Sequence, residues 1–195
     1  MRDILKLSLF LLVVAGIAGA ALTYVNSLAG PLIEKQILQA KIDSFKEVYP
    51  AGEKVENESA TYLKDPHDPM VKEVNVAYKA GVPAGVLYLV ESRGYSGAIS
   101  LLAGFDIATA RITAIKVLSQ RETPGLGAKA KESKFQDRYK EKGAAIPLEV
   151  TKGAPSKENE IQAITASTIT SKAVTKGVNA AREHFVAHFS GVKKP

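Results

Sequence analysis

The longest apolar run in the chain spans residues 7–25 and contains no charged side chain. At a rise of about 1.5 Å per residue, a helix of this length extends about 29 Å, which matches the hydrocarbon thickness of a bilayer. A cleaved signal peptide is the alternative, because residues 18–20 (Ala-Gly-Ala) resemble a small-residue cleavage site. The apolar run continues beyond them to Leu22 and Val25, and this favours an uncleaved transmembrane helix.

The charges that flank the apolar run predict its orientation. Arg2 and Lys6 precede it, and no basic residue follows it until Lys35. By the positive-inside rule, we expect the amino terminus in the cytoplasm and everything after the helix on the outer side of a plasma or inner membrane. Residues 1–28 are therefore expected to form a cytoplasmic N-terminus and a single-pass anchor.

The pattern after the anchor predicts a helical connector and then a loop. Apolar residues recur at helical spacing over residues 31–49, and Pro31 suits the first turn of such a helix. Residues 50–70 are rich in Glu, Lys, Pro and Asp, and we expect them to form a loop. Residues 29–70 should thus carry the chain from the membrane to a folded domain.

Apolar segments at strand spacing follow, at residues 71–78, 85–90, 97–102 and 111–118. Their regular, short spacing favours an antiparallel meander. Next, the pattern predicts a short helix at 131–139, a loop with one short strand at 140–160, and a final helix at about 171–189 with an apolar side. The expected fold class is α+β, a mainly antiparallel sheet flanked by helices, with the domain at residues 71–190 and a tail at 191–195.

Composition excludes several kinds of site. The chain has no cysteine, so it can neither ligate an iron–sulfur cluster through thiolates nor form a disulfide. The histidines, His67, His184 and His188, are not spaced as a metal-binding set. The formal net charge is +6, but the lysines are scattered, and no basic block with interleaved aromatic residues indicates nucleic-acid binding. No Gly-x-Ser-x-Gly elbow indicates a hydrolase.

Small and hydroxyl-bearing side chains crowd residues 163–171 (Ala-Ile-Thr-Ala-Ser-Thr-Ile-Thr-Ser), just before the final helix. Small neighbours would let a transferase reach the Thr168 hydroxyl, so this segment suits the acceptor of a covalent phosphoester. An ordinary helix N-cap and turn is the alternative, because Ser and Thr side chains commonly bond the amides of a first helical turn.

Two further motifs lie upstream. Residues 121–129 read Arg-Glu-Thr-Pro-Gly-Leu-Gly-Ala-Lys, in which Pro-Gly predicts a type II turn. The Gly-Leu-Gly is not a nucleotide-binding loop, because it lacks both the Gly-x-Gly-x-x-Gly fingerprint and a Gly-Lys-Ser/Thr ending. Residues 94–97 read Gly-Tyr-Ser-Gly between two predicted strands.

In this order, the motifs resemble those of the FMN-binding domain family over roughly residues 85–185. The family's flavinylation motif is Ser/Thr-Gly-Ala-Thr-x-Thr/Ser, and the resemblance implies that FMN is linked through its phosphate to Thr168. Ala166 stands where glycine is usual, Ser167 where alanine is usual, and Gln162 where Asp is frequent. A phosphate there would lie near the start of the final helix, where free amides and the helix dipole favour an anion.

The other motifs extend the implied cofactor site. Glu-Thr-Pro-Gly-Leu-Gly matches the family without a mismatch, and in the family this loop closes on the flavin ring, with glycines allowing close backbone approach. Besides Thr168, the candidate FMN-binding residues are Thr165, Ser167, Thr170, Glu122, Thr123, Leu126, Gly127 and Tyr95.

One anchor followed by one such domain is most similar to the G subunit of Rnf complexes, which couple electron transfer between ferredoxin and NAD to the pumping of sodium ions or protons. The resemblance implies a redox subunit, not catalytic alone, that passes electrons between iron–sulfur and flavin subunits. It also implies maturation by a flavin transferase that uses FAD and Mg²⁺. The alternatives are the C subunit of a sodium-translocating NADH:quinone reductase and an unmodified, membrane-tethered scaffold domain.

Overall fold

The computed structural model describes residues 2–64 and 68–189, and the chain divides into two compact units between Asp43 and Ser44. Most of the first unit is helix α1 (Arg2–Val48). Within the described residues, its segment Lys6–Ser27 is the one helical stretch that is long and apolar enough to cross a membrane. Its side chains are exposed, which suits an apolar solvent such as a bilayer.

Helix α1 is longer than the sequence predicted. The helix predicted over residues 31–49 is present, but the prediction that it begins at Pro31 was wrong, because the backbone is helical without interruption from Arg2 to Val48. Proline removes one intrahelical hydrogen bond, but its fixed φ of about −65° suits a helix. A single proline therefore does not end α1.

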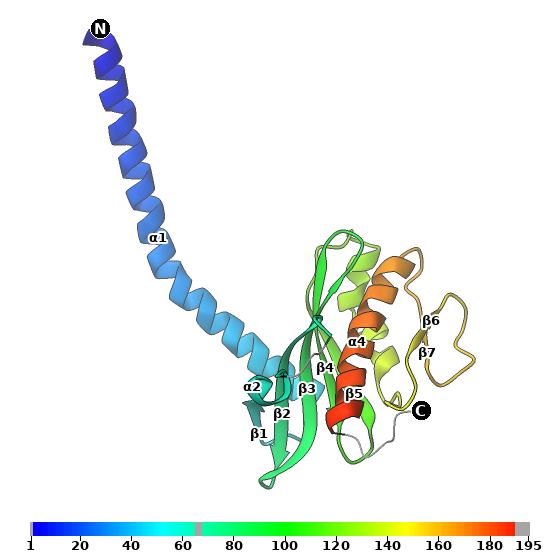
Figure 1. The fold of residues 1–195 in the computed structure, drawn as a ribbon. Helices are drawn as coiled ribbons and strands as arrows, with labels where there is room; N and C mark the ends of the chain where they lie inside the picture. The colour runs from blue at the N-terminus through cyan, green and yellow to red at the C-terminus, as the bar shows by residue number, and fades with distance from the viewer. Residues whose placement is uncertain (1, 65–67, 190–195) are drawn as a thin grey trace. The chain divides into compact units, whose positions relative to one another are not determined.

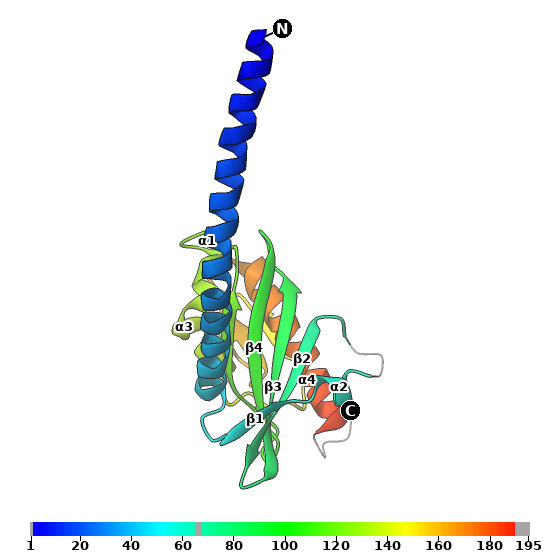
Figure 2. The same ribbon diagram turned by 90° about the vertical axis from the view of Figure 1, so that its left-hand side faces the viewer.

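The second unit is built on a five-stranded antiparallel sheet in the order β1-β2-β3-β4-β5 (Figure 1, Figure 2). The strands are β1 (Lys54–Asn57), β2 (Val71–Lys79), β3 (Val82–Arg93), β4 (Ala98–Asp106) and β5 (Arg111–Ser119). The last four confirm the predicted meander. Residues 50–70 were expected to be a loop, which was wrong in part, since they contain β1 and the short helix α2 (Ser59–Tyr62). The pattern hid β1 because it is an edge strand with partly exposed polar side chains.

The remainder of the unit differs from the sequence prediction in detail. Three short helices, η1 (Gly127–Lys131), α3 (Ser133–Gln136) and η2 (Asp137–Tyr139), replace the single helix predicted at 131–139. Strands β6 (Glu149–Thr151) and β7 (Glu160–Gln162) pair in parallel, where one strand was predicted. The side chain of Gln136 links these short helices to β5, because it donates to the Lys131 carbonyl at 2.6 Å and accepts from the Val117 amide at 2.9 Å.

Helix α4 (Thr168–His188) covers one face of the sheet (Figure 1). Its buried apolar side follows the predicted stripe, and the Phe185 ring stacks on Phe105 with ring centroids 4.9 Å apart. Gly177 allows close packing, because a Cβ there would lie 3.3 Å from side-chain atoms of both Val90 and Leu101. This packing fixes the position of the first turn of α4 relative to the ends of β3 and β4.

The end of α1 covers the opposite face of the sheet. Val48 and Tyr49 pack in a second, smaller core with residues of β2 to β5, namely Ala77, Leu87, Leu102 and Ala114. The Thr113 hydroxyl donates to the Val48 carbonyl at 2.7 Å. Gly85 makes room for the Tyr49 ring, because a Cβ there would lie 2.5 Å from a ring carbon. Both faces of the sheet are therefore covered.

Tyr49 should make the free energy of unfolding fall as the pH rises above 10.0. Its hydroxyl lies 2.9 Å from the Ala84 carbonyl and 3.0 Å from Asp106 Oδ2, and burial, helped by Asp106, raises the pKa of Tyr49 from 10.0 to about 12. The folded state keeps this proton more tightly, so the contribution is complete below pH 10.0 and is lost as the pH rises to about 12. Denaturant unfolding in detergent should show a smaller alkaline loss for Tyr49→Phe than for wild type, and equal losses would contradict this assignment.

Candidate functional site

A cavity of about 450 Å³ opens where three segments meet at one end of the domain. The tip of the β3–β4 hairpin contributes Tyr95, and the loop after β5 contributes Glu122, Thr123, Leu126 and Gly127. Residues 166–170 come from the end of the preceding loop and the start of α4. Figure 1 shows the hairpin tip, η1 and the N-terminal end of α4 at the same end of the sheet. The volume falls within the range of small-molecule sites, about 300–1,000 Å³.

The cavity brings together most of the residues selected from the sequence. Its lining includes Tyr95, Glu122, Thr123, Leu126, Gly127, Ser167, Thr168 and Thr170. Thr165 was selected too, but its side chain is exposed and lies outside the lining. Ala166 and Ile169 line the cavity and were not selected, although their positions beside Thr168 were a usable signal. The role of these residues as cofactor ligands stays a prediction.

Glu122 connects the three segments. Its carboxylate is buried; Oε1 accepts a hydrogen bond from the Ser96 amide at 2.9 Å, and Oε2 accepts one from the Thr170 hydroxyl. No ion pair to Glu122 occurs in the described part of the chain. Hydrogen bonds to a buried carboxylate are stronger than neutral ones, so Glu122 holds the hairpin, its own loop and α4 in one arrangement.

Glycines around Glu122 make this contact possible. A Cβ at Gly127 would lie 2.5 Å from Thr170 Oγ1 and 2.7 Å from Glu122 Oε2. A Cβ at Gly94 would lie 2.6 Å from Glu122 Oε1. The sequence suggested that Gly127 permits close approach to a flavin ring, whereas the structure gives it a second role, the accommodation of the Glu122–Thr170 contact. Gly125 has a φ of +76°, as the predicted type II turn requires.

The segment before Thr168 has an unusual backbone. Ala166 has a φ of +59°, in the left-handed region that costs a non-glycine residue roughly 1–2 kcal/mol. This explains in physical terms why glycine is usual at that position. The Ser171 hydroxyl fixes the segment, because it donates to the Ser167 carbonyl at 3.0 Å and accepts from the Ile164 amide at 2.9 Å. Arg138 adds a hydrogen bond to the Ala163 carbonyl at 3.3 Å.

The first turn of α4 has no side-chain cap. Ser167 occupies the N-cap position but makes no capping hydrogen bond, and its buried hydroxyl has no hydrogen-bond partner among the described residues. If Ser167 were an ordinary N-cap, its hydroxyl would accept a hydrogen bond from a backbone amide of the first turn. Amides of the first turn have no partner within a helix, and the helix dipole is positive at this end. Thr168 is the first helical residue and lines the cavity, so the arrangement suits an anionic group beside the Thr168 hydroxyl.

Comparison with known proteins agrees with this geometry. A model of the FMN-binding domain matches residues 94–183, which include all the segments around the cavity. The chain is 36% identical to the G subunit of the Na(+)-translocating ferredoxin:NAD(+) oxidoreductase complex of Acetobacterium woodii, over 91% of this chain and 89% of that protein. It is also 36% identical to the G subunit of the proton-translocating ferredoxin:NAD(+) oxidoreductase complex of Clostridium ljungdahlii, over 92% and 88% of the two chains.

A solved structure shows a similar fold. The C subunit of the Na(+)-translocating NADH-quinone reductase of Parabacteroides distasonis superposes with a TM-score of 0.51 and 25% identity, over 58% of this chain and 60% of that one. The two G subunits match at higher identity and over nearly the full length of both chains. This chain therefore belongs to the G-subunit family of ion-translocating ferredoxin:NAD(+) oxidoreductase complexes, and it carries an FMN-binding domain.

Proposed function

We propose that this chain carries one FMN, joined through its phosphate to the Thr168 hydroxyl, and acts as an electron carrier in an ion-translocating ferredoxin:NAD(+) oxidoreductase complex. The observation that supports this most strongly is the position of Thr168, which lines the cavity at the uncapped first turn of a 21-residue helix. An acceptor threonine needs an accessible hydroxyl and a neighbouring site for the phosphate charge, and both occur together here.

The residues around the cavity fit FMN. The buried Ser167 hydroxyl without a partner and the free first-turn amides offer donors for a phosphate. Leu126 and Ile169 offer apolar surface for a ring, and Tyr95 adds an aromatic side chain. FMN, when bound, supplies the redox chemistry, while the protein supplies orientation and electrostatics. Glu122 would support FMN binding without contacting the cofactor, because it keeps the three cavity-forming segments together.

The C subunit of a sodium-translocating NADH:quinone reductase is the second candidate function, since the solved structure of one such protein shares the fold at 25% identity. The two G-subunit relatives favour the first candidate, because they match at 36% identity along nearly their whole length. In either complex, the chain would exchange electrons with other redox subunits, and a flavin transferase would attach the FMN.

Optical spectra distinguish a chain with covalent FMN, in either of the two complexes, from an unmodified scaffold domain. The full chain, purified from a host that expresses a flavin transferase and then denatured, should stay yellow and should bleach on reduction. The same chain from a host without the transferase is the control and should be colourless after denaturation. A colourless denatured chain from both hosts would contradict covalent flavin and leave the scaffold as the better explanation.

The domain should lie outside the cytoplasm, because Arg2 and Lys6 precede the apolar segment and no basic residue follows it until Lys35. A protease that cannot cross the membrane, added outside spheroplasts, should therefore digest the domain. A cytoplasmic marker protein in the same sample should survive until lysis. Digestion of the domain only after lysis would contradict this topology.

A further inference from the structure

The mouth of the cavity has an exposed apolar rim. Tyr95 is 73% exposed, Ile169 57% and Leu126 41%, and these three side chains come from the hairpin, from α4 and from the loop after β5. Large apolar side chains gathered at one opening are unlike singly scattered ones, and they are typical of the centre of a binding surface.

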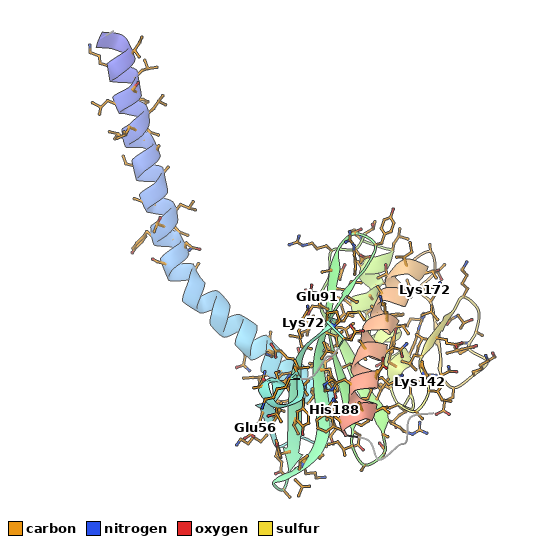
Figure 3. All side chains as sticks on the ribbon, viewed as in Figure 1. Glu56, Lys72, Glu91, Lys142, Lys172 and His188 are labelled. Carbon is orange, nitrogen blue, oxygen red and sulfur yellow. The ribbon has the colours of Figure 1, made fainter. Side chains whose placement is uncertain are left out.

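Cationic side chains flank the same three segments. We call them the basic collar: Arg93, Arg121, Lys129, Lys172 and Lys176. All are exposed, and within residues 2–64 and 68–189 none of them is part of an ion pair. A Cβ at Gly97 would lie 3.7 Å from the Arg121 Cβ, which places Arg121 beside the hairpin tip. Figure 3 shows Lys172 near the N-terminal end of α4.

The acidic side chains of these segments do not balance the collar. Glu122 is buried and already accepts two hydrogen bonds, from Ser96 and Thr170. Glu91 lines a neighbouring cavity together with Arg93, Tyr95 and Lys176, and Glu132 directly follows η1, so two exposed acids stand beside the five cations of the collar. The mouth therefore combines an apolar centre with an excess of cations at its periphery.

We propose that this mouth, with the flavin in the cavity, docks an acidic redox protein. Its Asp and Glu side chains pair with the basic collar, and its apolar centre covers the flavin together with the parts of Tyr95, Leu126 and Ile169 that the flavin leaves exposed. An apolar core with a charged rim is the usual anatomy of a protein interface. Weak redox complexes are small, and complementary charge raises their association rate. The inference rests on the proposed function, since a flavin in the cavity needs a second redox group, which an acidic protein brings and a lipid surface does not.

Zero-length crosslinking of the assembled membrane complex tests the proposal directly. A carbodiimide joins lysine to carboxylate only at contact distance, so peptide mass spectrometry should find Lys129, Lys172 or Lys176 linked to Asp or Glu of another protein of the complex. Lys79 and Lys152 are matched controls, because both are exposed and lie outside the cavity segments. Crosslinks to other proteins from the controls but not from the collar would overturn the proposal, and so would a complex without any collar crosslink.

Charge reversal gives a second test. Arg121→Glu with Lys172→Glu should slow electron exchange between the flavin and the rest of the complex by about tenfold or more at low salt, with a weaker salt dependence than wild type. Lys79→Glu with Lys152→Glu should leave the rate within twofold. Flavin content should not change in either variant, and the flavin reduction potential is measured in each so that the rates are compared at equal driving force. If the collar variant kept its flavin and its electron-exchange rate were unchanged, the docking proposal would be overturned and the proposed function would stand. If wild type itself carried no flavin, the proposed function would be overturned.

An anionic membrane surface is the alternative to a protein at the basic collar. Acetylation of the collar lysines distinguishes between these two occupants. In proteoliposomes of the full chain alone, the collar lysines should react with an acetylating reagent equally in zwitterionic and in phosphatidylglycerol-containing bilayers. In the assembled complex they should be protected. Protection by anionic lipid in the absence of the other subunits would assign the collar to the membrane and overturn the protein partner.

Discussion

Thr168→Ala should abolish covalent flavin completely, because alanine has no hydroxyl to esterify. The first turn of α4 and the cavity should remain, since the Thr168 side chain makes no hydrogen bond that holds the described structure together. In-gel flavin fluorescence of the denatured chain measures the loss. Electron transfer through the complex should fall with it, because FMN without its covalent link can dissociate from the chain.

Thr170→Ala is the matched control for this variant. Thr170 also lines the cavity, but its hydroxyl is buried and donates to Glu122, so it is not available as an acceptor. The control should keep its covalent flavin while losing up to about 1.5–3 kcal/mol of stability, the usual contribution of a hydrogen bond to a charged group. Flavin mapped to Ser167 or Thr170 would contradict the acceptor assignment but would not contradict the family.

Gly127→Leu should disrupt the site more than a change at Leu126 or Lys129 in the same region, because it breaks the Glu122–Thr170 contact. Its Cβ alone would come within 2.5 Å of Thr170 Oγ1 and 2.8 Å of the Glu122 Cβ, so the Glu122–Thr170 contact cannot persist. Overpacking of this kind typically costs about 1–3 kcal/mol. We expect a lower Tm, altered flavin fluorescence and a slower electron-transfer rate in the assembled complex.

Two further variants test whether the effect of Gly127→Leu comes from the clash with Glu122 and Thr170. At Gly143 nothing lies within 4 Å of a Cβ, so Gly143→Leu should have little effect on flavin properties. Leu126→Ala removes apolar surface from the cavity without a clash, so it should change the fluorescence and leave the Thr168 bond intact. If Gly127→Leu behaved like wild type in fluorescence and rate, the loop would be an ordinary surface turn.

Local sequence patterns predicted the elements that have strong periodicity. The meander β2 to β5 and the buried stripe of α4 followed from apolar spacing, because each of these elements buries one or both faces. Strand β1 and the continuity of α1 could not be predicted in this way. An exposed edge strand has no apolar period, and a proline inside a helix reads locally as its start.

The candidate site, too, has features that the sequence predicts and features that only the fold reveals. Glycine-rich and hydroxyl-rich motifs identified the segments that line the cavity and singled out Thr168 as the acceptor. They also selected Thr165 as a cofactor contact, although the fold leaves it exposed and outside the lining. The contact between Glu122 and Thr170 spans 48 positions in the chain, so only the folded structure reveals it. The alanine at residue 166 does not itself signal a positive φ, but the glycine that is usual at this position in the family was a usable signal of the left-handed backbone.

The most direct test of FMN attachment is the intact mass of the full chain, purified from a host with a flavin transferase. The mass should exceed that of the unmodified chain by one FMN less one water. Fragmentation of the peptide that contains residues 163–171 should place the addition on Thr168. A chain found only at its unmodified mass, from a host whose transferase modifies a control flavoprotein in the same preparation, would contradict covalent FMN on this protein.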